Sequence, residues 1–122
     1  MTDAPTALRY RREARVLEVE FPGGAHFALP AEYLRVESPS AEVQGHGPGQ
    51  KTIVGGRRHV GIIRMEPVGH YAVRIVFDDL HDSGIYTWVY LRELGEQQAA
   101  RWAAYEDALA ARRLSRDPPG RR

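Results

Sequence analysis

The residues best suited to chemistry form one short segment, His81-Asp82-Ser83, which contains the three residue types of a hydrolase triad. A triad requires hydrogen bonds that join nucleophile, base and acid in space, and three contiguous residues do not form that chain by themselves. The simpler interpretation is a turn from a strand into a helix, with Asp82 or Ser83 capping a helix that begins near Ile85. We therefore predict no catalytic residue and no enzyme. A pocket that joined this turn to His70 would favour the alternative, an enzyme acting on a small molecule.

A metal site is the second chemical possibility, because Asp78, Asp79 and His81 gather at the end of a predicted strand. Imidazole and carboxylate ligands suit zinc, iron or manganese. A further histidine, His46, His59 or His70, would have to approach in space, and the spacing matches no recognised metal motif. Metal binding through His81 and Asp79, with zinc or iron as the ion, is therefore the alternative hypothesis. Otherwise we predict no cofactor.

Two other patterns do not indicate a ligand. Residues 45–52 resemble a phosphate-binding P-loop, but Gln50 stands where a glycine must precede Lys51, and no strand–loop–helix context surrounds them. Arginines cluster near both ends of the chain, yet Tyr10 is the only aromatic residue close to them. Nucleic-acid surfaces interleave aromatic residues with arginines on a strand or groove. We therefore predict neither nucleotide nor nucleic-acid binding.

Composition narrows the class of protein further. The 122 residues fit one domain, and the formal charge of +1 gives no overall field that would attract nucleic acid or an anionic membrane. The absence of cysteine excludes disulfides, thiolate catalysis and cysteine-ligated zinc. No apolar run approaches the roughly 20 residues of a membrane span, and the first residues lack a signal core. We expect a cytosolic protein that does not bind membranes.

The first third of the chain predicts a small antiparallel meander. Residues 15–21 alternate apolar and polar side chains, and Pro22-Gly23-Gly24 separates them from a second apolar segment at 26–29. Leu8 and Tyr10 supply a further short strand. Pro30 then starts a short helix over 31–35, because its missing N–H would be unpaired in the first turn of a helix anyway.

The rest of the chain predicts more strands and a C-terminal helix. Residues 44–50 read as a mobile glycine-rich loop, 52–54 and 59–65 as a second hairpin, and 71–77 as the clearest strand, with its odd-numbered residues on one face. The period becomes helical from Ile85. The expected fold class is α+β, a small antiparallel β-sheet with short helices packed on it and a C-terminal α-helix. The expected segments are a disordered N-terminus at 1–6, a domain at 7–94, a helix at 95–114 with a narrow apolar stripe of Trp102, Tyr105 and Leu109, and a disordered basic tail at 115–122.

Three segments carry a family resemblance: YLRVESPSAE at 33–42, MEPVGHYAVRIVFDD at 65–79 and HDSGIYTWVYL at 81–91. From Leu8 to about Leu94 the chain resembles the gamma-butyrobetaine hydroxylase-like N-terminal domain family. Similar members occur as stand-alone bacterial proteins, ahead of 2-oxoglutarate- and iron-dependent oxygenases, and fused to ATP-binding iron–sulfur carriers. The resemblance therefore implies an accessory or interaction module, while the oxygenase's catalytic domain has no counterpart in this length.

The resemblance also implies where a metal would sit in relatives. Members linked to oxygenases hold a structural zinc through a Cys-x-Cys-x-x-Cys segment and a histidine. By position the cysteines fall on Ser38, Ser40 and Val43, and the histidine falls on His81. Hydroxyl groups and a valine do not replace thiolates as zinc ligands, so we expect packing and hydrogen bonds to hold this segment instead. Leu80 stands where the family usually has glycine, which questions a turn with positive φ.

We therefore predict a non-enzymatic cytosolic accessory domain of uncharacterised function that binds an unidentified protein partner. Its oligomeric state is left open. Trp88 and Tyr90 add aromatic residues to the helix near this surface, although aromatic residues at helical spacing usually serve the core. The expected interaction surface comprises Tyr33, Arg35, Ser38, Ser40, Glu42, His70, Asp79, His81, Asp82 and Ser83.

Overall fold

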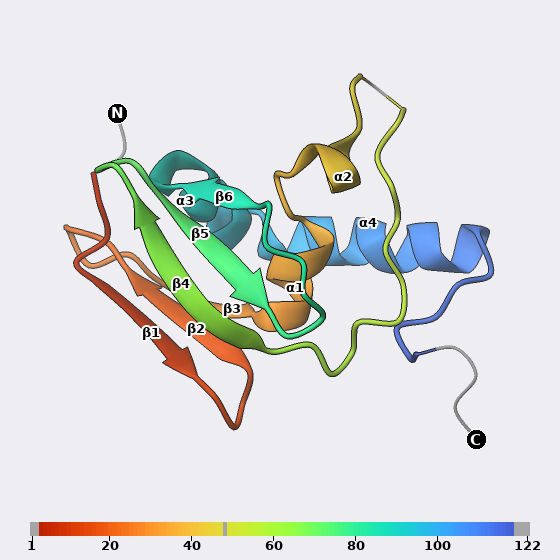
Figure 1. Ribbon diagram of the computed structural model, residues 1–122, viewed down its shortest axis with the longest axis horizontal. Coiled ribbons are helices and arrows are strands. Elements are labelled where there is room, and N and C mark those ends of the chain that lie inside the picture. The colour runs from red at the N-terminus through yellow and green to blue at the C-terminus, as the bar shows by residue number, and fades with distance from the viewer. Residues whose placement is uncertain (1–2, 48, 119–122) are drawn as a thin grey trace.

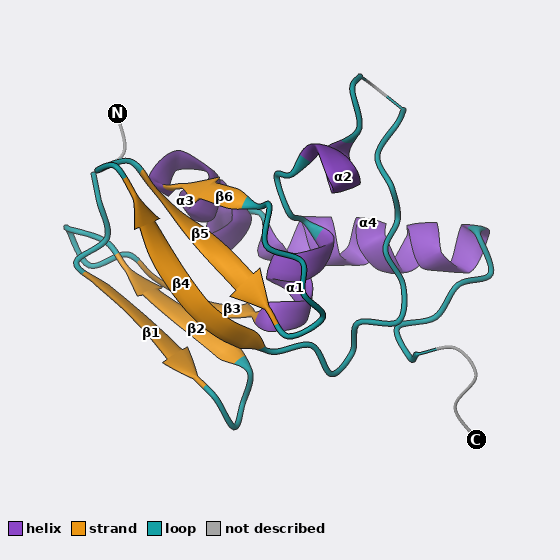
Figure 2. Ribbon diagram, in the orientation of Figure 1, coloured by secondary structure: helices purple, strands orange, loops and turns teal. Residues whose placement is uncertain are grey.

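Two antiparallel sheets form the frame of the molecule in the computed structural model, which describes residues 3–47 and 49–118 (Figures 1 and 2). Each sheet has three strands that are adjacent in chain order. The first sheet contains β1 (Ala7–Arg11), β2 (Val16–Glu20) and β3 (His26–Pro30). The second contains β4 (Ile62–Val68), β5 (Ala72–Phe77) and β6 (Ile85–Thr87). Short connections between consecutive strands explain this simple order.

Helices cover the sheets and extend away from them. Between the two sheets, the chain forms α1 (Ala31–Val36) and the single turn α2 (Ala41–Gln44). After β6 it forms α3 (Trp88–Glu96) and α4 (Gln98–Ala111). Helix α1 contacts β3, and α3 contacts β3, β6 and α4. Figure 1 shows α4 projecting beyond the sheets. In the described part of the chain, no helix combines the length and the apolar character needed to span a membrane.

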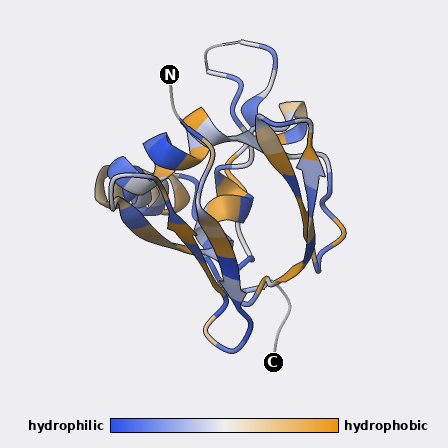
Figure 3. Cartoon of the chain, turned by 90° about the vertical axis from the view of Figure 1, so that its left-hand side faces the viewer, coloured by the Kyte–Doolittle hydropathy of each residue, from blue (hydrophilic) through white to orange (hydrophobic). Residues whose placement is uncertain are grey.

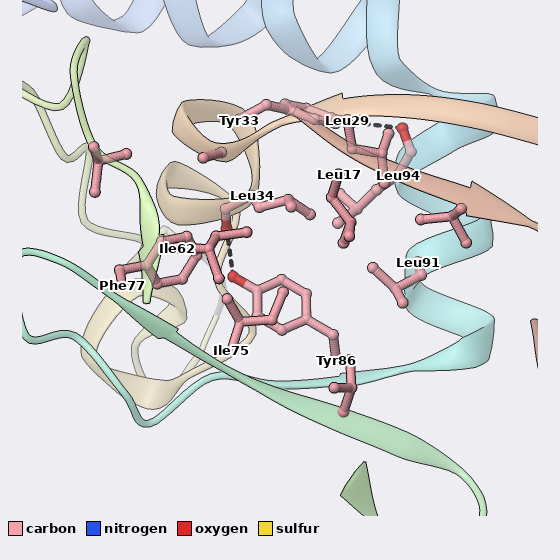
Figure 4. Packing of buried hydrophobic residues seen from close by; sticks show 14 of the residues in the cluster. Leu17, Leu29, Tyr33, Leu34, Ile62, Ile75, Phe77, Tyr86, Leu91 and Leu94 are labelled. Carbon is pink, nitrogen blue, oxygen red and sulfur yellow. Dashed lines mark hydrogen bonds between the residues drawn. The ribbon is translucent and has the colours of Figure 1, made fainter. Parts of the chain in front are cut away.

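The core lies between the two sheets and their helices. Figure 3 shows hydrophobic residues on strands of both sheets and on the helical ribbon between them. Figure 4 shows the buried side chains pointing toward one another. The fully buried members of this core are Leu17, Val19, Leu29, Ala31, Leu34, Ile75, Phe77, Tyr86, Leu91 and Leu94. Because these residues come from both sheets, α1 and α3, the core joins all of these elements into one unit.

Two buried tyrosines bring hydroxyl groups into this apolar interior. Tyr33 donates to the Leu94 carbonyl oxygen at 2.7 Å, and Tyr86 donates to the Leu34 carbonyl oxygen (Figure 4). Burial raises the pKa of both phenols. Each hydroxyl therefore stays protonated and satisfies a backbone carbonyl that would otherwise lose its hydrogen bond to water.

The α+β fold class is confirmed, as are the first meander, the short helix after Pro30 and the strand near residues 71–77. Val73, Ile75 and Phe77 face the core, as expected. Tyr71, which was placed on the same face, instead precedes β5 and is 56% exposed. Strand β5 is the centre of its sheet and is buried on both faces, because Ala72 and Val76 are buried as well.

Two predicted elements are wrong. The hairpin between 52–54 and 59–65 does not form, and β4 pairs with β5 instead. Backbone N–H groups in the 55–58 segment donate to carbonyls of Ser115 and Arg116, which replaces strand pairing. Residues 85–87 are not helical but form β6 against β5. The N-cap of α3 is therefore Thr87, whose hydroxyl accepts from the Tyr90 N–H at 3.0 Å, and neither Asp82 nor Ser83 has that role.

The C-terminal part also differs from its prediction. The helix predicted over 95–114 is α4, which spans residues 98–111, with Tyr105 and Leu109 of its stripe buried against Val36. The predicted disordered tail is held in place at Ser115–Asp117 by hydrogen bonds to the 55–58 segment. Residues 119–122 of the predicted tail lie outside the described residues, and so do residues 1–2 of the predicted disordered N-terminus. Thr6, at the end of that N-terminal segment, donates its N–H to the Glu20 carbonyl oxygen of β2.

Candidate functional site

The candidate site lies where the connection between α1 and α2 meets the turn between β5 and β6 (Figure 1). Ser40 is the N-cap of α2, and its hydroxyl accepts from the Glu42 N–H at 3.0 Å. This cap directs the chain from Ser38 to Glu42 along the β5–β6 turn, which carries His81 and Ser83. We call these five residues, Ser38, Ser40, Glu42, His81 and Ser83, the polar cluster.

The centre of the polar cluster is a line of three side chains. Ser38 Oγ lies 2.9 Å from His81 Nε2, and His81 Nδ1 lies 3.1 Å from Glu42 Oε1. A carboxylate only accepts hydrogen bonds, so Nδ1 carries the imidazole proton and Nε2 accepts from the Ser38 hydroxyl. The line therefore has the order of groups found in a serine–histidine–acid triad.

Burial fixes the charge of His81. The residue is 8% exposed, and burial, with the nearby Arg35 guanidinium, lowers the pKa of its imidazole despite the opposing carboxylates. The imidazole is therefore neutral at neutral pH. A neutral ring with one donor and one acceptor fits its two neighbours, Glu42 and Ser38.

Two more serines extend the polar cluster. Ser83 Oγ donates to Glu42 Oε1 at 2.8 Å and lies 2.9 Å from Ser40 Oγ. The Ser40 N–H donates to Ser38 Oγ at 3.3 Å. The five residues thus form a closed network across about forty positions of sequence, and it ties the α1–α2 connection to the β5–β6 turn.

A pair of arginines holds the other end of the same turn. Arg35 Nε and Arg57 Nε donate to one oxygen of Asp79, Oδ2, at 2.8 and 2.7 Å. The other oxygen accepts from the His81 N–H at 3.2 Å. Partial burial opposes ionisation of Asp79, but the bonds from Arg35, His81 and Arg57 outweigh it and lower the pKa of the carboxyl. Asp79 is therefore ionised and fully engaged within the protein.

The triad-like line does not have the access that catalysis requires. Ser38 is completely buried, and a Cβ at Gly84 would lie 2.6 Å from Ser38 Oγ, so the turn backbone covers the hydroxyl closely. A nucleophile must reach its substrate, and this oxygen reaches only its protein neighbours. The arrangement supports a structural role for Ser38 and His81.

The residues present do not fit the metal hypothesis. The His81 nitrogens face Ser38 and Glu42, whereas both oxygens of Asp79 accept other protein bonds. Over residues 3–47 and 49–118, no group of three or more histidine, aspartate or glutamate side chains could hold a metal ion. At the positions expected to carry zinc ligands in relatives, Ser38, Ser40 and His81 make hydrogen bonds within the protein, and Val43 is buried and apolar.

Half of the residues assigned to the interaction surface cannot contact a partner. Tyr33, Arg35, Ser38, Ser40 and His81 are buried. Each of them makes an internal hydrogen bond, although Nη1 of Arg35 is buried without a partner among the described residues.

The remaining residues of that surface are divided between two places. Glu42 and Ser83 of the polar cluster are exposed, as is the neighbouring Asp82, and Asp79 of the same turn is partly exposed. His70 is exposed at the opposite end of β5, in the β4–β5 turn, where its carbonyl oxygen accepts from Trp88 Nε1. The six residues of β5 span about 20 Å, so His70 belongs to a separate surface.

Leu80 is the unusual residue of the β5–β6 turn. Its φ is +72°, in the left-handed region that glycine adopts easily, and its side chain is 79% exposed. A leucine in this conformation costs about 1–2 kcal/mol. The turn thus keeps the geometry of a glycine-containing turn while projecting an apolar side chain into solvent.

Two contributors to the site carry little signal in the sequence. Arg57 reaches Asp79 from 22 positions away, and no local pattern indicates it. Gly84 allows the close approach of Ser38, and the Ser83-Gly84 pair signals only a turn.

Together, the two sheets, the helices and the partly buried polar cluster define a small α+β domain whose polar residues stabilise a connection between distant segments. The chain belongs to the family described as gamma-butyrobetaine hydroxylase-like, N-terminal, whose model matches residues 8–92.

Solved structures agree with this assignment. A protein solved in solution by NMR is 41% identical, with a TM-score of 0.84, and the match covers 99% of this chain and 95% of that one. A second NMR structure is 44% identical, with a TM-score of 0.83, over 96% and 87% of the two chains. A crystal structure of a DUF971-family protein of unknown function from Acidithiobacillus ferrooxidans is 42% identical, with a TM-score of 0.64, over 75% and 91%. Comparison with curated proteins finds no match.

Proposed function

We propose that this protein is a non-enzymatic cytosolic domain that acts by binding another protein. The observation that carries the proposal is the exposed Leu80 on its left-handed turn. An apolar side chain held in solvent on a left-handed backbone is a feature that a binding partner would explain, because such backbone strain concentrates at functional sites.

The surroundings of Leu80 define the partner's chemistry. Exposed Asp78, Asp82 and Ser83 belong to the same turn as Leu80, and exposed Glu42 is joined to this turn by the hydrogen bond from Ser83. We call these five residues, Leu80 included, the acidic rim. Arg74, at 3.8 Å from Asp82, offsets part of this charge. A partner with an apolar pocket bordered by lysine or arginine would complement the acidic rim.

The polar cluster supports a binding role in a second way. Its Ser38 and His81 are buried and bonded to each other, so the groups suited to catalysis are used to hold the turn. Rigid support of this kind positions the acidic rim before a partner arrives, which lowers the entropy cost of association. The interaction is thus the role that the arrangement favours over catalysis.

The test is affinity capture from the cytosol of the natural host with three tagged chains: wild type, Leu80→Ser and Val89→Ser. Val89 is the matched control, because it is an apolar residue exposed at 48% on α3. We expect wild type and Val89→Ser to recover the same stoichiometric partner, and Leu80→Ser to recover at least about tenfold less. Equal recovery by Leu80→Ser, or no stoichiometric partner in repeated captures, would contradict the proposal.

A further inference from the structure

Residues Ser115–Asp117 lie against residues 55–58, Glu32 of α1 and Trp102 of α4, and we call the surface that they contact the groove. Figure 1 shows this segment meeting the chain that leads toward β4. The Gly56 N–H donates to the Ser115 carbonyl oxygen at 2.8 Å, and the Arg58 N–H donates to the Arg116 carbonyl oxygen at 2.9 Å. The groove therefore binds the main chain of an irregular segment through backbone donors, as peptide-binding sites do.

The Arg116 side chain makes the contacts that would give the groove its specificity. Its Nε and Nη2 donate to the two oxygens of Glu32 at 2.8 and 2.7 Å, and its guanidinium lies 5.1 Å from the centre of the Trp102 ring. The Glu32 side chain is 7% exposed. A buried carboxylate requires a cation, and its planar pair of oxygens beside an aromatic face fits a guanidinium better than an ammonium group.

The rest of the segment fits the groove less completely. Asp117 pairs with Arg58 at the exposed edge. A cavity of about 250 Å³ remains beside Arg116, lined by Pro30, Tyr33 and Gln98 as well as by Glu32 and Trp102. The segment's own side chains leave this space open, so an occupant with an additional apolar side chain would bury more surface there.

The link between α4 and the segment is short. Helix α4 ends at Ala111, and the left-handed Arg113, with φ of +56°, closes the helix, because the Leu114 N–H donates to the Leu109 carbonyl oxygen at 2.9 Å. The helix end therefore directs the chain back toward residues 55–58 and keeps the segment close to the groove.

We propose that this groove is a recognition site for a peptide of a partner protein that presents an arginine followed by a carboxylate and flanked by an apolar residue. The segment Ser115–Asp117 is then a built-in competitor that imitates this peptide. The groove uses α1 and α4, whereas the acidic rim uses the β5–β6 turn, so this site goes beyond the proposed function and does not depend on Leu80.

The test measures peptide binding to the full chain by fluorescence anisotropy. The probe is a labelled peptide with the sequence of residues 114–118, Leu-Ser-Arg-Asp-Pro, and its control carries citrulline, the neutral isostere of arginine, in place of arginine. Wild type is compared with Arg116→Ala, and with Arg116→Lys as a second variant that keeps the charge but loses the paired geometry. Near-ultraviolet circular dichroism confirms that each variant is folded.

We expect Arg116→Ala to bind the arginine peptide at least about tenfold more tightly than wild type does, because a tethered tail acts at an effective concentration on the order of millimolar. Arg116→Lys should fall between them, and the citrulline peptide should bind about tenfold more weakly or worse. Folded variants that bind both peptides equally, or neither, would overturn the proposal. A wild-type dimer abolished by Arg116→Ala would also overturn it, because the occupant would then be the tail of a second copy.

Discussion

The apolar core and the polar cluster both join distant parts of the chain, but they do so by different forces. The core gathers side chains from both sheets, α1 and α3 by removing apolar surface from water. The polar cluster joins the α1–α2 connection to the β5–β6 turn through directional bonds centred on His81. Packing tolerates small adjustments, whereas a hydrogen-bond network depends on each donor meeting its acceptor. The core therefore sets stability, and the polar cluster sets the position of one surface turn.

The largest effect is expected from introducing cysteine thiolates at the three positions where relatives are expected to carry zinc ligands. In the variant Ser38→Cys/Ser40→Cys/Val43→Cys, we expect the three thiolates and His81 Nε2 to bind one Zn²⁺ per chain in a tetrahedral site, with Glu42 still orienting the ring. Zinc should then raise Tm by well over ten degrees, measured by calorimetry with and without chelator. The same variant with His81→Ala should bind zinc much more weakly, and a zinc-independent Tm would contradict the expectation.

The core should respond most strongly to a cavity. Leu34 is completely buried in α1 and packs in the core. We expect Leu34→Ala to lower the free energy of unfolding by about 3 kcal/mol, measured by urea denaturation. Leu114→Ala, at a residue exposed at 45%, is the control and should change it by about 0.5 kcal/mol or less. A loss below about 1 kcal/mol at Leu34 would show that the core is not well packed there.

The polar cluster, unlike the core, should lower the free energy of unfolding as the pH falls from 7 to 5. The folded protein lowers the pKa of His81, so the unfolded chain binds a proton first as the pH falls. The stability from neutral His81 is therefore complete above the unfolded pKa of about 6.5 and is lost as the pH falls from there toward the lower folded pKa. Denaturation from pH 7 to 5 should show this loss in wild type and in His59→Gln, but much less in His81→Gln. Equal slopes in all three proteins would contradict the burial of a neutral imidazole.

The smallest expected effect is a gain at the strained turn. Leu80→Gly should relieve the left-handed conformation, although the greater freedom of glycine in the unfolded chain offsets part of the benefit. We expect a net increase of about 0.5 kcal/mol in the free energy of unfolding, with loss of the partner captured by wild type. A destabilised Leu80→Gly protein would mean that the leucine side chain contributes to the fold, and that the acidic rim needs another explanation.

The elements predicted correctly are those that depend on residues close together in the sequence. The alternation at 15–21 and the Pro22-Gly23-Gly24 turn indicate the first meander, and the run of apolar residues at 72–77 indicates the central strand. These signals are local, because each strand pairs with the next one along the chain.

Contacts between distant residues explain the errors. The 52–54 segment looks like a strand by composition, but its neighbours bond to Ser115 and Arg116, some sixty positions away. Residues 85–87 have a helical spacing of apolar residues, and the edge of β5 captures them as a strand instead. The composition of residues 115–122 predicts disorder, yet Arg116 is paired with Glu32, which is buried on α1.

The five residues of the polar cluster were predicted from the sequence, but their arrangement was not. The family resemblance placed Ser38, Ser40 and His81 together, and hydrogen bonds hold them as expected. Their burial, and the contact of Glu42 with His81 Nδ1, depend on the approach of segments about forty positions apart. Several residues that were expected at the surface are therefore buried in the structure.

Ser38 and His81 act together to hold the β5–β6 turn, and a double-mutant cycle measures this coupling. Ser38→Ala, His81→Ala and the double variant would be compared with wild type by urea denaturation at pH 7.5. We expect a coupling energy of about 1 kcal/mol or more, because each single change leaves the other group buried without its partner. Effects that add within about 0.3 kcal/mol would contradict the claim and would free His81 for another role.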